Sequence, residues 1–274
     1  MTYFAFLATF VFIPILVLLL ITWLDNRANR PPPGFDAKKV PLSIAVHVFL
    51  ALAYTTPWDN YLVATGVWSY NPALVSGIVF GWVPLEEYTF FVVETVLSGL
   101  WWWFLTRRIG QSSSRVAAYR DPVEQRFRPS PRLIYLSTFL LSTAWLFFTY
   151  QFFFGPDSWN YLGIIFFWAL PAILPQLLFG ADILWHYRKL LFWTIFPPAL
   201  YLSLTDIVAL RASTWSISPA QTTGILFFGI LPLEEVAFFF ITNTLIGFGL
   251  TLMLSNLSQQ RLADWRARGF KGLP

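Results

Sequence analysis

The chain has 274 residues, of which 57% are hydrophobic and only 12% are charged, whereas soluble domains carry roughly 25% charged residues. A soluble fold of this length would leave about a quarter of its surface in water and could not hide so much apolar material, so we predict an integral membrane protein. With no cysteine, two histidines and a net charge of +4, the composition excludes disulfides and thiolate metal sites and does not indicate a metal or nucleic acid.

Seven segments are long and apolar enough to cross a bilayer as helices, which takes about 20 residues each. They are residues 3–24, 41–57, 73–105, 133–154, 161–180, 189–210 and 221–254. The first has no basic residue before it and a long apolar run, so we expect a retained helix and not a signal peptide. The predicted fold class is an all-α integral membrane protein with seven transmembrane helices.

Lys and Arg residues fall almost entirely in alternate loops between these spans. Four lie in residues 25–40, seven in 106–132, two at 188–189 and four in the tail, while the loops on the other side hold only Arg211. The positive-inside rule therefore places the amino terminus outside and the carboxyl terminus in the cytoplasm. We expect a multi-pass protein of the cell membrane, with membrane lipid as its solvent.

A short motif occurs twice in the chain. Residues 84–91 read PLEEYTFF and residues 232–239 read PLEEVAFF, and upstream of them Asp59 matches Asp206 and Trp68 matches Trp215. Such self-similarity indicates an internal repeat. We predict a parallel 3+1+3 arrangement. Residues 1–105 form the first repeat, 106–160 an Arg-rich cytoplasmic loop with a linker helix, 161–254 the second repeat, and 255–274 a cytoplasmic tail.

Two pairs of adjacent glutamates are the main candidates for chemistry: Glu86 with Glu87, and Glu234 with Glu235. Each pair is expected near the middle of a span, where an ionisable residue is costly and is a functional candidate by default. Carboxyls held away from water and without Lys or Arg partners are expected to keep some protons at neutral pH. A protonated carboxyl can then act as an acid and an ionised neighbour as a base. We hypothesise that Glu86 or Glu234 is the acid.

The residues around the glutamates suggest a chamber for a carbocation reaction. Pro84 and Pro232 precede the pairs and are expected to kink the helices there. Aromatic faces stabilise a cation by about 0.5–2 kcal/mol each. The candidate substrate-binding residues are Phe90, Phe91, Phe238, Phe239 and Glu94. Two questions stay open. The glutamate pairs could instead form a structural hydrogen-bonding clamp, and Asp59 and Asp206 could serve either as turn or cap residues or in catalysis.

With these motifs, the chain resembles the membrane-embedded, flavin-free lycopene β-cyclase family, in the form of a single-chain fusion of the two small cyclase subunits. The resemblance implies that lycopene or a related linear carotenoid is the substrate and that no cofactor is needed. It also implies a redox-neutral, proton-initiated closure of the ψ-ends to β-ionone rings, by way of γ-carotene to β-carotene. The four motif glutamates would carry the proton transfers. The absence of a G-x-G-x-x-G fingerprint likewise disfavours a flavin-dependent cyclase.

Two other functions remain as alternatives at this point. A proton-coupled small-solute transporter of 3+1+3 architecture would also place carboxylates inside the membrane. A carotenoid hydratase would share the first protonation but let water capture the cation. The sequence leaves open which glutamate is acid or base, which ring isomer forms, whether one or both ends are cyclised, and the oligomeric state.

Overall fold

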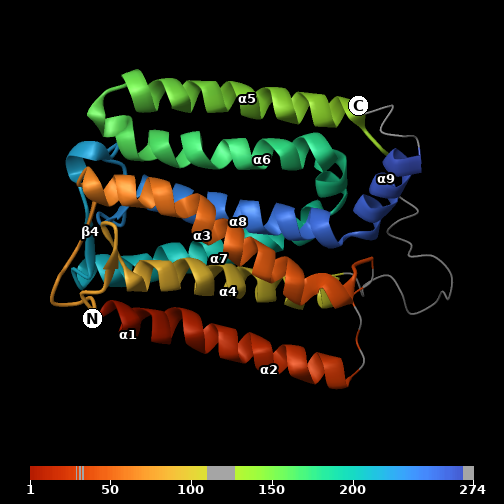
Figure 1. Ribbon diagram of the computed structural model, residues 1–274, viewed down its shortest axis with the longest axis horizontal. Helices are drawn as coiled ribbons and strands as arrows, with labels where there is room; N and C mark the ends of the chain where they lie inside the picture. The colour runs from red at the N-terminus through yellow and green to blue at the C-terminus, as the bar shows by residue number, and fades with distance from the viewer. Residues whose placement is uncertain (29, 31, 33, 110–126, 268–274) are drawn as a thin grey trace.

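The computed structural model describes residues 1–28, 30, 32, 34–109 and 127–267 as an elongated bundle of long helices (Figure 1). Within these residues, seven helical segments are long and apolar enough to cross a membrane, which confirms the predicted number of spans. The central part of the predicted Arg-rich loop, residues 110–126, and the end of the tail, residues 268–274, lie outside the described residues.

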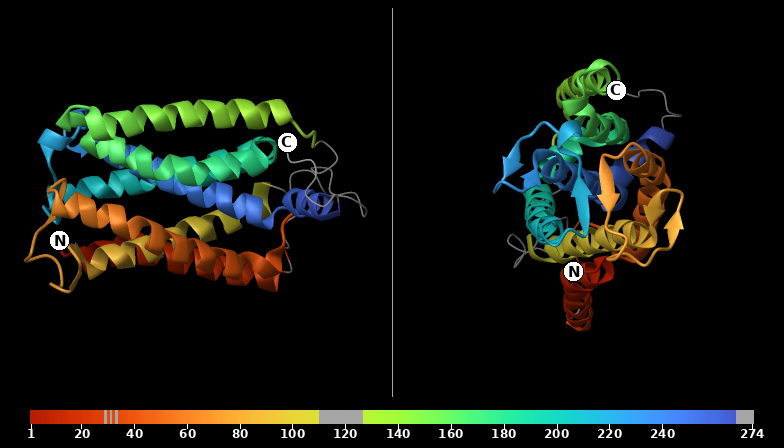
Figure 2. Two further views of the ribbon diagram at one scale, coloured as in Figure 1. Left: turned by 45° about the horizontal axis from the view of Figure 1, so that its top comes forward. Right: turned by 90° about the vertical axis from the view of Figure 1, so that its left-hand side faces the viewer.

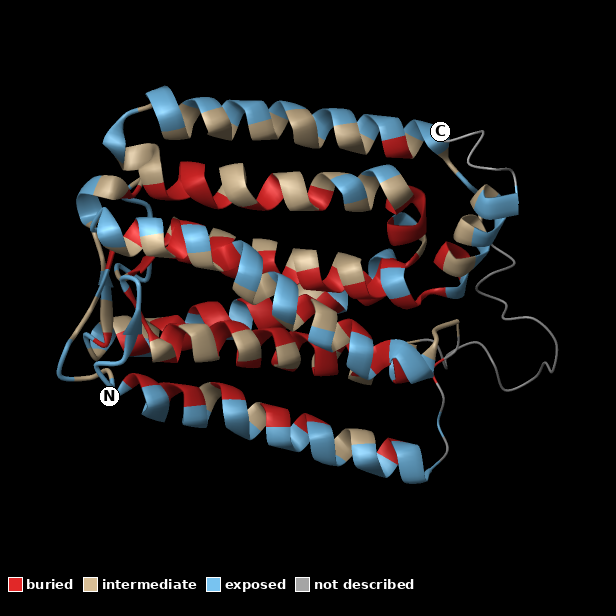
Figure 3. Ribbon diagram, in the orientation of Figure 1, coloured by how far each residue is buried: buried red, intermediate tan, exposed pale blue. Residues whose placement is uncertain are grey.

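The first span consists of α1 (Tyr3–Leu7), a π-helical turn at Ala8–Phe12 and α2 (Ile13–Arg27). The other helices are α3 (Val40–Ala64), α4 (Leu85–Ile109), α5 (Pro131–Phe154), α6 (Asn160–His186), α7 (Arg188–Arg211), α8 (Leu233–Leu254) and the short α9 (Asn256–Ala267). Helix α4 is the most buried of the spans, whereas α2 and α5 expose much of their apolar surface (Figure 3). That exposed surface is what contact with lipid requires.

Three short antiparallel strand pairs lie at the end of the bundle where Met1 lies, opposite α9, and we call this the hairpin end (Figures 1 and 2). Strand β1 (Trp68–Tyr70) pairs with β4 (Trp215–Ile217), so that Ser69 lies opposite Ser216. Strands β2 (Val79–Phe80) and β3 (Val83–Pro84) form one hairpin, and β5 (Leu226–Phe227) and β6 (Leu231–Pro232) form another. The β1–β4 pair thereby joins segments that are far apart in the sequence.

The prediction that residues 73–105 and 221–254 are helical throughout is wrong. Helix α4 begins at Leu85 and α8 at Leu233, and the preceding prolines lie in strands β3 and β6 and do not kink a helix. Proline restricts the residue before it to extended conformations, which favours a helix start after it. The hairpins turn at Gly81 (φ 69°) and Gly229 (φ 70°), in a conformation that favours glycine. The hairpins are rich in apolar residues, so their hydropathy resembles that of a membrane helix.

The later helix start changes the position of the glutamate pairs. Glu86 and Glu87 lie in the first turn of α4, and Glu234 and Glu235 lie in the first turn of α8. The expectation that they sit near the middle of a span is therefore wrong. Helix α4 has 25 residues, which gives a length of about 37 Å, so its glutamates lie within one turn of the hairpin end.

Candidate active site

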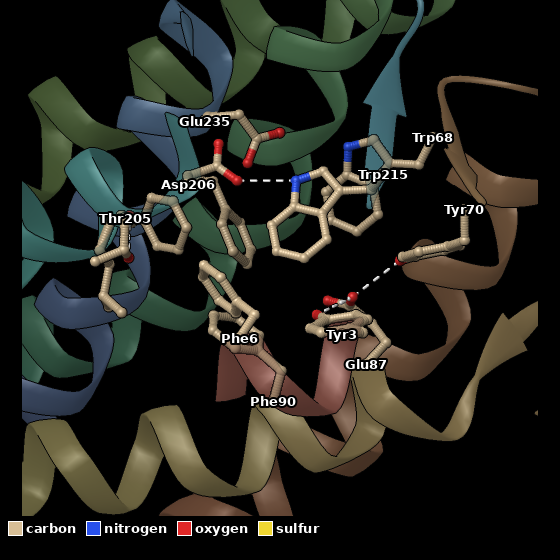
Figure 4. A pocket seen from close by; sticks show the side chains of 13 residues that line it. Tyr3, Phe6, Trp68, Tyr70, Glu87, Phe90, Thr205, Asp206, Trp215 and Glu235 are labelled. Atoms are coloured by element: carbon tan, nitrogen blue, oxygen red, sulfur yellow. Dashed lines mark hydrogen bonds between the residues drawn. The ribbon is translucent and has the colours of Figure 1, made fainter. Parts of the chain in front are cut away.

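A small cavity of ≈ 30 Å³ lies beneath the β1–β4 pair, lined by residues from α1, α4, α7, α8 and the two strands (Figure 4). Three carboxyl side chains face it, those of Glu87, Glu235 and Asp206. Among the described residues, no Lys or Arg lines it, and no ion pair joins any of these three carboxyls to a cation. The space is sufficient for a water molecule, and the rest of its wall is largely aromatic.

Glu87 is held by two tyrosines. The hydroxyl groups of Tyr3 and Tyr70 both donate to its Oε2, over 2.6 Å and 2.9 Å, and only 5% of the Glu87 surface is exposed (Figure 4). Burial, followed by the negative charge of Glu87, raises the pKa of Tyr70 well above its ordinary value. Tyr70 is therefore a neutral hydrogen-bond donor at neutral pH.

Glu235 lies on the opposite side of the cavity, with Asp206 near it (Figure 4). Its Oε1 accepts a 2.6 Å hydrogen bond from the hydroxyl group of Tyr161. Asp206 accepts a 2.9 Å bond from the indole N–H of Trp215 through Oδ1, while its Oδ2 is buried without a hydrogen-bond partner among the described residues. Two carboxyls in such dry surroundings repel each other when both are charged.

Glu86 and Glu234 lie outside the cavity. Glu86 accepts a hydrogen bond from the backbone N–H of Ser76 and another, over 3.1 Å, from the Ser76 hydroxyl. Glu234 accepts a 2.7 Å bond from the backbone N–H of Thr223. Adjacent helical residues point about 100° apart, so one member of each pair faces the cavity while the other binds the segment that leads into its hairpin.

Aromatic side chains form most of the cavity wall, as the sequence predicts for part of the set. Phe90, Phe238 and Phe239 line it, whereas Phe91 does not. The rings of Phe90 and Phe239 are 6.3 Å apart in an edge-on arrangement. Trp215 covers another side, with its ring centre 5.0 Å from that of Phe6. Ring faces and edges thus surround the three carboxyls.

A larger groove of ≈ 250 Å³ adjoins this cavity between α3, α4, α6 and α8, and we call it the α3/α6 groove. Phe238 is the residue that lines both spaces. Phe91 and Glu94 line the groove, and Glu94 accepts hydrogen bonds from Thr242 (3.2 Å) and Asn243 (3.5 Å) of α8. A second, more apolar groove of ≈ 450 Å³ lies between α2, α4 and α7.

Several residues of the site were not among the sequence-based candidates. The sequence leaves open whether Asp206 has a turn or cap role or a catalytic one, and the structure places it within α7, 1% exposed and facing the cavity. Asp59 is equally buried within α3 but does not line the cavity. The tyrosines gave a weaker signal, because Tyr3 and Tyr161 begin their spans at a different spacing from that of the repeated motif.

Comparison with known proteins gives the family. The chain is 34% identical over 265 residues to a lycopene beta-cyclase of Halobacterium salinarum, and the match covers 95% of this chain and 99% of the relative. The chain belongs to the lycopene cyclase family. This membership confirms the resemblance found in the sequence.

Fungal relatives are larger proteins with a second activity in their names. A bifunctional lycopene cyclase/phytoene synthase of Gibberella fujikuroi is 32% identical over 228 residues, which cover 77% of this chain and 34% of the fungal protein. A protein of the same name from Pyrenophora tritici-repentis is 34% identical over 244 residues, 84% of this chain and 38% of that protein. No family model matches the chain, and no solved structure matches it significantly.

Proposed function

We propose that this chain is a lycopene β-cyclase, which closes β-ionone rings at the ψ-ends of lycopene by acid–base catalysis without a redox change. Besides the family membership, one observation carries the proposal. Glu87 and Glu235 face one small, largely aromatic cavity, and each is held by a tyrosine hydroxyl and not by a cation. Carboxyls with neutral partners can both give and accept a proton.

The reaction needs one proton in and one proton out. An acid protonates the terminal double bond of the ψ-end, the next double bond attacks the cation to close the ring, and a base removes a proton to leave the ring double bond. We assign these steps to Glu87 and Glu235, in place of the sequence-based hypothesis that Glu86 or Glu234 is the acid, because only Glu87 and Glu235 of the four line the cavity. The rings of Phe90, Phe238 and Phe239 would stabilise the cation by about 0.5–2 kcal/mol each. Glu86 and Glu234 would hold the hairpins in place.

The substrate chain would reach the cavity through the α3/α6 groove. The cavity of ≈ 30 Å³ is too small for a six-membered ring, whereas the adjoining groove has ≈ 250 Å³ and a largely apolar wall. Phe238 lines both spaces, so the ψ-end would displace its ring on entry. Phe91 and Glu94 would then contact the polyene behind the reacting end.

The predicted 3+1+3 repeat, with its domain boundaries, belongs to the same proposal. Corresponding contacts support it: Tyr54 of α3 donates to the Trp168 carbonyl of α6, and Tyr201 of α7 donates to the Phe10 carbonyl of the first span. The antiparallel pairing of β1 with β4 is also what a two-fold axis along the bundle would produce. The positive-inside rule puts the hairpin end, and with it the active cavity, outside the cytoplasm.

Expression in cells that accumulate lycopene tests the function. We expect the chain to convert lycopene to cyclised products of unchanged mass, whereas a hydratase would add the mass of water and a transporter would leave lycopene intact. Glu87→Gln and Glu235→Gln should each lower the cyclisation rate about 100-fold or more. Glu86→Gln and Glu234→Gln are matched controls one residue away. Full activity in both Glu87→Gln and Glu235→Gln would contradict the proposed site.

A further inference from the structure

The two glutamates that face the cavity have different hydrogen-bond partners. Glu87 accepts two tyrosine O–H bonds on one oxygen, from Tyr3 and Tyr70. Glu235 accepts one such bond, from Tyr161, and the Asp206 carboxyl lies beside it on the same side of the cavity (Figure 4). Helix position does not distinguish them, because each is the third residue of its helix and meets the same helix dipole.

A single sequence difference accounts for the extra donor. The spacing that matches Trp68 with Trp215 also matches Tyr70 with Ile217. Tyr70 and Ile217 end strands β1 and β4, yet only Tyr70 carries a hydroxyl group, and that group reaches Glu87. The second half of the molecule therefore has no phenol at the place where the first half has Tyr70.

These partners favour opposite charge states for the two glutamates. A carboxyl that accepts two O–H bonds is stabilised in its ionised form. Each glutamate also has a buried aspartate within electrostatic reach, Asp206 for Glu235 and Asp59 for Glu87. The second O–H bond to Glu87 therefore distinguishes the two, because Glu235 accepts only one such bond beside the Asp206 carboxyl and its ionised form is stabilised less. Glu87 thus has the character of a base and the Glu235–Asp206 pair that of an acid.

We propose, on the basis of the cyclase function proposed above, that the glutamates of the two halves have different roles in proton transfer. Glu235 donates the first proton, Glu87 removes the last, and Tyr70 is the positioning residue that holds Glu87 as the base. The alkene electron pair takes the proton of Glu235, the next alkene pair forms the ring C–C bond, and a C–H pair becomes the ring double bond as its proton passes to Glu87. Exchange through water then returns the proton from Glu87 to Glu235.

The ring isomer of the product reports on the base alone. The cyclised cation has C–H bonds on three neighbouring carbons, two in the ring and one methyl group. Removal of a proton from each gives a β-ring, an ε-ring or a ring with an exocyclic double bond. The position of the base selects among them, whereas the acid has already acted. The isomer ratio is also independent of how much enzyme is folded.

Tyr70→Phe and Tyr161→Phe form a matched pair, because each removes one O–H bond to one glutamate. We expect both to lower the rate about tenfold. Only Tyr70→Phe should turn a single ring isomer into a mixture, measured by chromatography and NMR of the products from full-length enzyme in membranes. Glu87→Asp and Glu235→Asp form a second matched pair. Both should lower the rate, but only Glu87→Asp should give a mixture of ring isomers, because the shorter side chain displaces the base.

The outcomes separate this proposal from the function on which it rests. If Tyr161→Phe and Glu235→Asp gave a mixture of isomers while Tyr70→Phe and Glu87→Asp did not, Glu235 would be the base and the proposal would be overturned. A constant isomer ratio in all four variants, with Glu87→Gln and Glu235→Gln inactive, would overturn the difference in roles while the cyclase site stands. Full activity of both glutamine variants would instead show that the proposed site itself is wrong.

Discussion

Buried carboxylates at the two ends of the bundle have different kinds of partner. At the hairpin end, Glu87 and Glu235 accept hydrogen bonds from tyrosine hydroxyls. At the α9 end, Asp182 accepts bonds of 2.9 Å and 2.7 Å from the guanidinium group of Arg261. Asp25 likewise faces Arg108 at 2.9 Å. All four carboxylates are 5% exposed or less.

The difference indicates which acids serve stability and which serve chemistry. An arginine favours the charged form of a carboxylate beside it, which suits a structural ion pair. A tyrosine hydroxyl is neutral, so the carboxyl that it binds remains able to change its protonation state. We therefore interpret the α9 end as a structural anchor and the hairpin end as the reactive end.

The largest effect on stability is expected for the Arg261–Asp182 ion pair at the α9 end. Arg261→Met leaves Asp182, which is 4% exposed, as a buried charge without its cation, and we expect a loss of about 3–5 kcal/mol in the free energy of unfolding. Thermal denaturation in detergent would measure it. The activity of the protein that remains folded should not change, because the pair lies at the far end of the bundle from the cavity.

A double variant provides the control for this prediction. Arg261→Met combined with Asp182→Asn removes the uncompensated charge, so it should recover part of the stability that the single variant loses. The structural reading would be wrong if the double variant were less stable than Arg261→Met alone. It would also be wrong if Arg261→Met lowered the rate per folded molecule while leaving the stability unchanged.

A smaller effect is expected for the two acids that share the motif but not the cavity. Glu86→Ala leaves the Ser76 N–H without its acceptor, and Glu234→Ala does the same to Thr223, so each should cost about 1–3 kcal/mol of stability. Activity per folded molecule should stay within about tenfold of the original. A loss above 100-fold without loss of stability would move the chemistry to these residues and contradict the proposed assignment.

Much of the architecture could be predicted from the sequence. Hydropathy gave the seven spans, since a lipid-facing helix must be apolar over its whole length. It failed at residues 73–84 and 221–232, because the hairpins there are as apolar as the helices that follow them. The placement of Pro84 and Pro232 in those strands moved the glutamates from the expected middle of a span to its end.

The candidate site could be predicted only in part, because the sequence does not show where the helices start. The repeated motif identifies Glu87 and Glu235 but does not distinguish them from Glu86 and Glu234, because the direction of a side chain depends on where the helix starts. Tyr70 reaches Glu87 from strand β1, and Trp215 reaches Asp206 from β4. Such contacts between distant segments depend on tertiary packing, which no local pattern in the sequence specifies.

The smallest expected effect concerns the β1–β4 pair that closes the reactive end. Ser69 and Ser216 share one exposed hydrogen bond of 2.8 Å between their hydroxyl groups. Ser69→Ala should cost about 0.5–1.5 kcal/mol of stability and should leave the product unchanged, because neither serine lines the cavity. Ser69→Ala combined with Ser216→Ala should cost hardly more than either single variant, since all three remove the same bond. Additive losses in thermal denaturation would mean that each serine contributes separately, and the pair would then not be a direct link between the two halves.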